Sequence, residues 1–174
     1  MKKNLALFLN LLMFTQLIGV AMENKIKFDN ETYNLSVNTE NGYNYYLKGE
    51  NSDNWHSKLS IENLSNEQNP TEASAEFAHQ VQAENPSASV LVYPDAATAG
   101  YLTASKDYYE YSAIVFQKAK RKGVDKFSYS KRFYVSEFKD NADARKNAIE
   151  FAQSYNKKYM ELVNKIAPKY KSDN

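Results

Sequence analysis

The feature that most restricts the fold is an alternation of apolar and polar side chains over residues 126–138. The apolar set is Phe127, Tyr129, Phe133 and Val135, and the polar set is Ser128, Ser130, Arg132 and Ser136. A period of two is typical of a β-strand with one face in the core. Residues 108–118 are also rich in β-formers, and a loop with Lys122-Gly123 separates the two segments. We therefore predict a long hairpin with strands at 108–118 and 126–138.

Shorter strands are predicted before this hairpin. Asp29-Asn30 and Asn41-Gly42 are turn signals between segments with strand-like composition. Residues 57–64 alternate again, with Leu59 and Ile61 set against polar neighbours. The predicted strands are residues 25–28, 31–37, 43–49, 57–64, 89–93 and 98–104.

Two helices complete the pattern. Asn69-Pro70-Thr71-Glu72 combines a capping residue, a proline at the first helical position and a glutamate three residues after the cap. This predicts a helix over 70–84 with Ala73, Phe77, Ala78 and Val81 on its buried side. A second helix is predicted from a cap at Asp140 or Asn141 to Ile166. Its apolar stripe comprises Ala148, Ala152, Tyr155, Tyr159, Leu162, Val163 and Ile166.

This order predicts an α+β domain, an antiparallel β-sheet with a short helix and a long C-terminal helix packed on one face. It resembles the PsbP-like fold, and more closely the small bacterial periplasmic proteins of the DcrB type. The residues that carry the resemblance are Trp55 with Leu59-Ser60-Ile61, the helix at 70–84, the strand pair 111–117 and 127–134, and the helix after Asn141. The resemblance implies a non-catalytic envelope role and supplies no catalytic residue. DcrB-type proteins commonly carry a lipoprotein cysteine, and this chain has no cysteine, so their membrane anchor does not carry over.

The N-terminus predicts export. Lys2 and Lys3 precede an apolar run over 5–20, and Gly19-Val20-Ala21 offers small residues for cleavage. Asn10 and Gln16 interrupt the run, which favours a signal peptide over a membrane span. We expect residues 1–21 to be a secretory signal peptide and 22–174 a single domain, periplasmic or secreted, without a transmembrane span.

Charge is distributed unevenly along the chain. Residues 22–110 contain 5 lysines and 14 acidic residues, whereas residues 111–174 contain 15 basic and 7 acidic residues. Either the two halves attract each other in the folded domain, or a basic face binds an anionic partner such as lipid headgroups, cell-wall polymer or an acidic protein. The candidate contacts are the cations of the predicted hairpin tip, which are Lys118, Lys120, Arg121, Lys122 and Lys126.

Aromatic side chains suggest a further contact surface. Tyr43, Tyr45 and Trp55 lie in a polar stretch near the Asn41-Gly42 turn, and such amphipathic aromatics are enriched at interfaces. The alternative is that they are half-buried strand residues. Basic and aromatic residues interleave at 126–134 as in nucleic-acid binders, but the export signal argues against nucleic acid as a partner.

The patterns that carry catalysis are missing from the sequence. The two histidines, His56 and His79, have no metal-ligand spacing, and the isolated glycines form no phosphate loop, so we expect no metal and no cofactor. Ser57, Ser60, Ser128 and Ser130 are nucleophile candidates without a Gly-x-Ser-x-Gly motif. The candidate acids are Glu31, Glu40, Glu50, Asp53 and Glu62. We therefore predict a non-catalytic interaction protein of the bacterial envelope, either immunity-type or an accessory factor. The alternative is a carboxylate-dependent hydrolase or a periplasmic protein that binds a small ligand.

Overall fold

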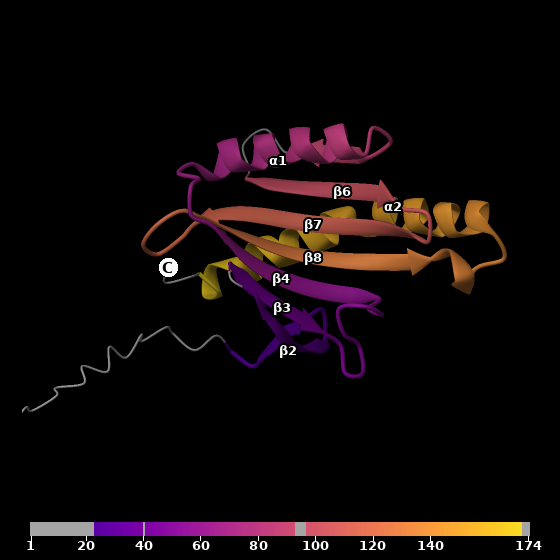
Figure 1. The fold of residues 1–174 in the computed structure, drawn as a ribbon, viewed down its shortest axis with the longest axis horizontal. Coiled ribbons are helices and arrows are strands. Elements are labelled where there is room, and N and C mark those ends of the chain that lie inside the picture. Colours follow the sequence, from indigo (N-terminus) through magenta and orange to yellow (C-terminus); the bar gives the residue numbers. More distant parts are fainter. Residues whose placement is uncertain (1–22, 40, 93–96, 172–174) are drawn as a thin grey trace, which may run out of the picture.

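A computed structural model describes residues 23–39, 41–92 and 97–171 (Figure 1). In this part of the chain eight strands form one antiparallel sheet with the order β1-β2-β3-β4-β8-β7-β6-β5. The strands are β1 Lys25–Phe28, β2 Glu31–Thr39, β3 Gly42–Tyr46, β4 Ser57–Leu64, β5 Ser89–Val92, β6 Thr98–Ala104, β7 Tyr108–Lys118 and β8 Val124–Tyr134. The helices are α1 Pro70–Glu84 and α2 Asn141–Ile166, and the short 3-10 helices are η1 Val135–Glu137 and η2 Ala167–Lys169. The predicted fold class is confirmed. The predicted signal peptide lies outside the described residues.

The sheet consists of two meanders of four strands that meet along β4 and β8. α1 carries the chain from β4 to the far edge at β5, and the second meander then returns strand by strand until β8 pairs with β4. This pairing runs without interruption from Ser57 opposite Lys131 to Leu64 opposite Val124. The predicted hairpin of β7 and β8 therefore lies inside the sheet, where both strands are paired on both sides.

Two predicted strands end earlier than expected. β8 ends at Tyr134, and Val135–Glu137 forms η1 instead of extending the strand to Phe138. β3 ends at Tyr46 instead of Gly49, because the chain leaves the sheet in a turn in which Gly49 has a φ of 89°. Alternation of side chains continues past both ends in the sequence, but no strand of the described residues pairs with the chain there.

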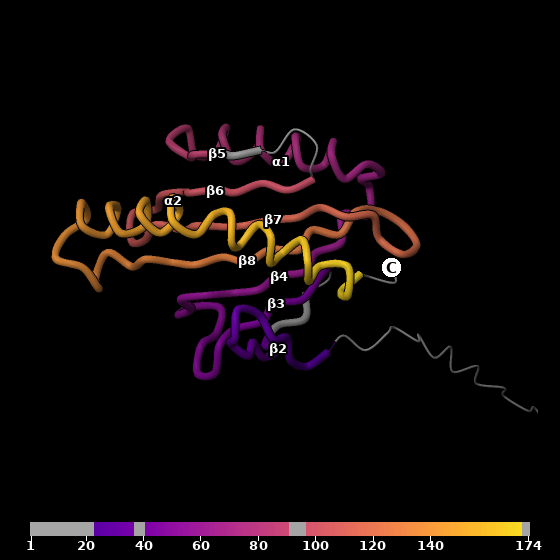
Figure 2. Tube along the Cα trace, turned by 180° about the vertical axis from the view of Figure 1, so that it is seen from behind, coloured from indigo at the N-terminus to yellow at the C-terminus, as the bar shows by residue number. Residues whose placement is uncertain are grey.

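The helices lie on opposite faces of the sheet, which corrects the expectation that both cover one face (Figures 1 and 2). α1 begins at Pro70, and the Asn69 side chain accepts a hydrogen bond from the Thr71 amide as predicted. Ala73 and Ala78 of α1 pack with Ile114 and Phe116 of β7. The intervening residues of β7 belong to the core under α2. Because successive strand residues point to opposite faces, the two helices must be on different sides.

α2 crosses the other face and holds the larger core. Asp140 caps it by accepting from the Asp143 amide at 2.9 Å. Its Tyr159 ring stacks on Tyr129 at 4.4 Å and on Phe28 at 6.1 Å, so one side chain joins α2, β8 and β1. The predicted stripe is largely confirmed, with Ala148, Tyr159 and Val163 buried.

Two positions of α2 depart from the prediction. Tyr155 is 44% exposed, so it lies at the margin of the stripe and not in it. Asn156 is buried instead and accepts a hydrogen bond from Tyr111 Oη at 3.0 Å. A Cβ at Gly100 would meet the Asn156 side chain, so this glycine makes room for the amide.

Ion pairs join the acidic and basic halves of the chain. Lys158 lies 2.7 Å from Asp29, Lys126 lies 2.6 Å from Glu62 and Arg132 lies 3.0 Å from Glu110. Each pair links an acid before residue 111 to a cation after it. The first of the two interpretations of the charge asymmetry, attraction between halves, therefore has direct support. One of the three pairs, Lys126 with Glu62, includes a cation of the predicted hairpin tip.

Candidate functional site

The second face of the sheet is only partly covered, and this creates a groove. α1 packs on β5, β6 and β7, whereas no helix of the described residues covers the same face of β3, β4 and most of β8 (Figure 1). A cavity of about 340 Å³ lies there, beside α1. We call it the serine groove. Its lining includes Asn44, Lys58, Ser60, Glu62, Phe77, Glu110, Ser112, Ile114, Lys126, Ser128 and Ser130.

Hydroxyl and amide groups form the floor of the serine groove. Ser128 and Ser130 of β8 are 6% and 4% exposed, below the longer side chains that surround them. Ser130 Oγ lies 2.7 Å from Ser112 Oγ of β7, and Ser60 Oγ donates to Asn44 Oδ1 of β3 at 2.7 Å. Four adjacent strands thus contribute small polar groups to one surface. Each hydroxyl can donate and accept, which suits a ligand with mixed polar groups.

Charged side chains border this floor at both ends. Glu62 pairs with Lys126 at one end, and Glu110 pairs with Arg132 at the other. Lys58 is the exception, because no carboxylate in the described part of the chain forms an ion pair with it. The described charges around the groove therefore comprise three cations and two anions, with Lys58 in excess.

The position of Lys58 is set by its neighbours. Its Nζ lies 4.5 Å from the centre of the Trp55 ring, and in the strand register it is opposite Ser130. Burial lowers the pKa of Lys58, Glu110 opposes this effect and Arg132 adds to it. A partly desolvated ammonium without a carboxylate partner is a strong site for an anionic or acceptor group of a ligand.

Trp55 lies beneath these cations and is only 2% exposed. The Arg132 guanidinium stacks between the Trp55 and Tyr108 rings, at 3.9 and 4.0 Å. Tyr45 is 0% exposed, and Tyr43 is half-buried and packs against the core under α2. We therefore correct the assignment of Tyr45 and Trp55 to a contact surface: Tyr45 is a fully buried residue of β3, and Trp55 is buried in the loop before β4. Trp55 supports the groove from below instead.

The predicted basic surface is divided in the structure. Lys118, Lys120, Arg121 and Lys122 are exposed at the tip between β7 and β8, and we call these four residues the basic tip. Gly123 closes this tip with a φ of 89°, and a Cβ there would approach the Leu64 carbonyl at 2.5 Å. Lys126 does not belong to the tip. It lies within β8, pairs with Glu62 and contacts the Phe77 ring at 4.7 Å, so it is a groove residue.

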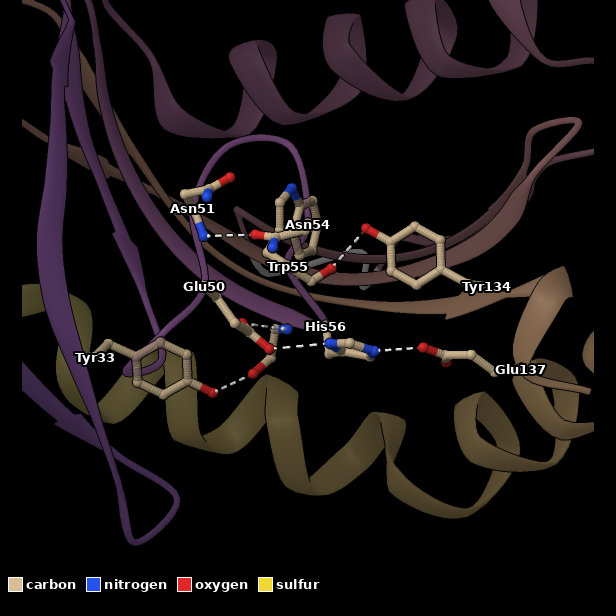
Figure 3. A network of polar contacts seen from close by, with 9 residues as sticks. Tyr33, Glu50, Asn51, Asn54, Trp55, His56, Tyr134 and Glu137 are labelled. Carbon is tan, nitrogen blue, oxygen red and sulfur yellow. Dashed lines mark hydrogen bonds and ion pairs between the residues drawn. The ribbon is translucent and has the colours of Figure 1, made fainter.

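His56 lies outside the groove, where it joins two segments (Figure 3). Its Nδ1 is 3.1 Å from Glu50 Oε1, and its Nε2 is 2.6 Å from Glu137 Oε1. Glu50 belongs to the loop before β4, and Glu137 to η1. The hydrogen bond with Glu137 has the largest effect and raises the pKa of His56; burial opposes this rise, and the hydrogen bond with Glu50 adds to it. The protonated ring can donate to both carboxylates, which ties the loop of Trp55 to the end of β8.

Groove serines of the described chain hydrogen-bond to each other and to an amide. In the described chain, no groove serine hydrogen-bonds to a histidine or lysine, and both nitrogens of His56 are engaged by glutamates. Glu62 and Glu110 are each engaged by a cation, Lys126 and Arg132 respectively. The described residues contain no group of three or more potential metal ligands.

Some predicted site residues converge and others do not. Ser60, Ser128 and Ser130 meet in the groove, whereas Ser57 lies on the other face and bonds to Tyr33 Oη at 3.0 Å. Of the candidate acids, Glu62 lines the groove and Glu50 binds His56, and Glu40 lies outside the described residues. Sequence reasoning missed Lys58, Ser112 and Glu110 as groove residues. The polar face of β8 was the available signal, but the partner strands could not be assigned.

Comparison with known proteins places the chain in a protein family but gives no information on its activity. Neither the curated proteins nor the solved structures gave a match. A protein-family model matches residues 20–168, a range that contains every strand and both long helices. Among the described residues, no helix is long and apolar enough to cross a bilayer. The chain therefore belongs to the protein family whose model matches residues 20–168.

Proposed function

We propose that this protein is a non-catalytic binding protein of the bacterial cell envelope, and that the serine groove is its binding site. The observation that carries the proposal is the cavity on this sheet face, which the buried Ser128 and Ser130 line together with Lys58, a lysine that has no carboxylate partner among the described residues. A sheet face that only faced solvent would need no buried polar floor. A concave site with a few convergent polar groups is the usual form of a ligand site.

The envelope location rests on the sequence. The positive start, the apolar run over 5–20 and the small residues 19–21 support export, and the PsbP-like, DcrB-type resemblance supports an accessory or immunity-type role. The basic tip is a second contact within the same proposal. Its four exposed cations suit an anionic envelope component or an acidic protein, and rim charges of this kind mainly accelerate association.

A block of the groove tests this function. Ser60→Trp would place an indole over the hydroxyl floor, and Ser154→Trp on the exposed side of α2 is the matched control. Both variants and the parent are screened by thermal shift against envelope components, including polysaccharides, peptidoglycan fragments and anionic lipids. We expect at least one component to stabilise the parent and the control but not Ser60→Trp. A stabilisation that survives Ser60→Trp would place binding elsewhere.

A second candidate function has its own observation. A cavity of about 470 Å³ lies between α2 and strands β5 and β6, and its lining includes Leu102, Tyr111, Ile149, Ala152 and Asn156. This more apolar site fits the alternative of a small-ligand binder with its pocket between sheet and helix. Ala152→Trp would fill this cavity, so loss of ligand stabilisation in that variant alone would favour it.

A further inference from the structure

We propose that the serine groove recognises an acidic sugar, either a free sugar acid or a sugar-acid residue of an envelope polysaccharide. This inference rests on the proposed function and names the class of its ligand. It follows from three properties of the groove: the hydroxyl floor, Lys58 without an ion-pair partner among the described residues, and the wall on the α1 side.

The floor matches the chemistry of sugar hydroxyls. Ser60, Ser112 and Ser130 come from three different strands, and Asn44 adds an amide from a fourth. Sugar hydroxyls donate and accept as serine hydroxyls do, so the two surfaces can satisfy each other without a fixed donor pattern. An extended peptide would instead require free backbone groups at a sheet edge, and β4, β8 and β7 are all paired on both sides.

The charge balance requires one negative group on the ligand. Lys126 and Arg132 are neutralised by Glu62 and Glu110, so Lys58 supplies the net charge of the site. Lys58 is opposite Ser130 in the strand register and lines the same cavity as the hydroxyl floor. A carboxylate bound to Lys58 and ring hydroxyls bound to the serines would use both features at once.

The wall and the volume agree with a sugar ring. Phe77 of α1 and Ile114 of β7 line the groove beside α1, and apolar groups there suit the ring carbons. The cavity of about 340 Å³ is near the small end of ligand pockets, which suits one or two sugar residues. Lys126 already contacts the Phe77 ring, so the wall is polar towards its outer end.

The test is an NMR titration of the full-length chain with D-glucuronate, D-glucose and acetate at constant ionic strength. We expect glucuronate to shift the amides of Ser60, Ser112, Ser128 and Ser130, with an affinity about tenfold to a hundredfold higher than that of glucose. Acetate should bind more weakly than glucuronate, because it lacks the hydroxyls. Equal affinities for glucuronate and glucose, or no shift at the groove, would overturn the inference.

Charge variants isolate the role of Lys58. Lys58→Met keeps the stem over Trp55 and removes the charge, so glucuronate should bind it no better than glucose. Lys58→Arg should restore the preference for glucuronate, and Lys165→Met, an exposed lysine of α2, should leave it unchanged. A Lys58→Met variant that is folded by its spectrum and retains the preference would overturn the assignment.

Two further comparisons separate the possible sources and the possible failures. A hyaluronan tetrasaccharide that binds more tightly than glucuronate would assign the site to a polymer, and the reverse order would assign it to a free acid. If sugar acids show no binding while another envelope component binds the parent and does not bind Ser60→Trp, the sugar inference is wrong and the proposed function stands.

Discussion

The contact between Gly100 and Asn156 predicts that Gly100→Ala destabilises the parent protein but not a variant that lacks the Asn156 amide. Gly100→Ala would place a Cβ against the Asn156 side chain, 3.2 Å from its Cγ and closer still to its Oδ1. Asn156 is 9% exposed and is held by Tyr111 Oη, so it can withdraw only by giving up that hydrogen bond. Overpacking of this kind costs about 1–3 kcal/mol. The alanine also lowers the conformational entropy of the unfolded chain, which stabilises the folded protein by about 0.4–1 kcal/mol. We expect a net loss of about 1–2 kcal/mol.

Removal of the amide should reverse the effect. In an Asn156→Ala background the added methyl enters vacated space, so Gly100→Ala should be neutral or stabilising by up to about 1 kcal/mol. The assay is urea unfolding followed by Trp55 fluorescence, with the m-value checked for constancy. Asn164→Ala, in the same helix but bonded to Thr98, is the control background and should leave the cost of Gly100→Ala intact.

Two results would contradict the packing of Gly100 against Asn156. Coupling between Gly100 and Asn156 of less than about 0.5 kcal/mol would be within the range of independent sites. It would show that the sheet and α2 separate freely at this point. A stabilising Gly100→Ala in the parent would refute the packing directly.

Three further predictions concern the core, the histidine and the basic tip. Phe133→Ala, at a residue 8% exposed, should cost about 3–5 kcal/mol in urea unfolding, and a cost within error would refute its place in the core. His56→Gln should lose less than about 1 kcal/mol near pH 5.5 and nothing near pH 9. The pKa of His56 is raised on folding, so its contribution is full below its usual value of 6.5 and fades as pH rises through the raised value; an equal loss at both pH values would exclude this origin. Replacement of Lys120, Arg121 and Lys122 by Glu should slow association with an anionic partner and weaken the dependence of its rate on salt, with little change in thermal stability. Unchanged association kinetics would show that the basic tip is ordinary solvated surface.

Local signals predicted the elements well. The bounds of α1 and of β4, β6 and β7 are those expected, because caps, turns and alternation are encoded within a few residues. The predicted strand ends at Gly49 and Phe138 were wrong, because β3 and β8 end at Tyr46 and Tyr134, where their pairing with neighbouring strands stops. Tyr155 and Asn156 show that helix periodicity has the same limit, because it carries no information about the surface that the helix packs on. The apolar stripe could not predict that a glycine of β6 leaves room for a buried amide.

The candidate site was harder to predict than the elements. Its residues come from four strands whose order depends on the return of β8 to β4, and no local pattern encodes that return. Ser60, Ser128 and Ser130 were identified only as isolated nucleophile candidates. Lys58 was not distinguished from other lysines, because its lack of a carboxylate partner is a property of the assembled groove.

The seam between β4 and β8 has a consequence for how the chain folds. It pairs Ser57 with Lys131 and Leu64 with Val124, contacts of high sequence separation that raise the contact order and slow folding. The first meander also depends on late residues, because Ile26 and Phe28 pack in one core with Tyr159, Met160 and Tyr170. The N-terminal strands cannot bury their apolar face until the end of the chain has been synthesised. A chain shortened before α2 should therefore remain open to proteases and to aggregation, however complete its strands are.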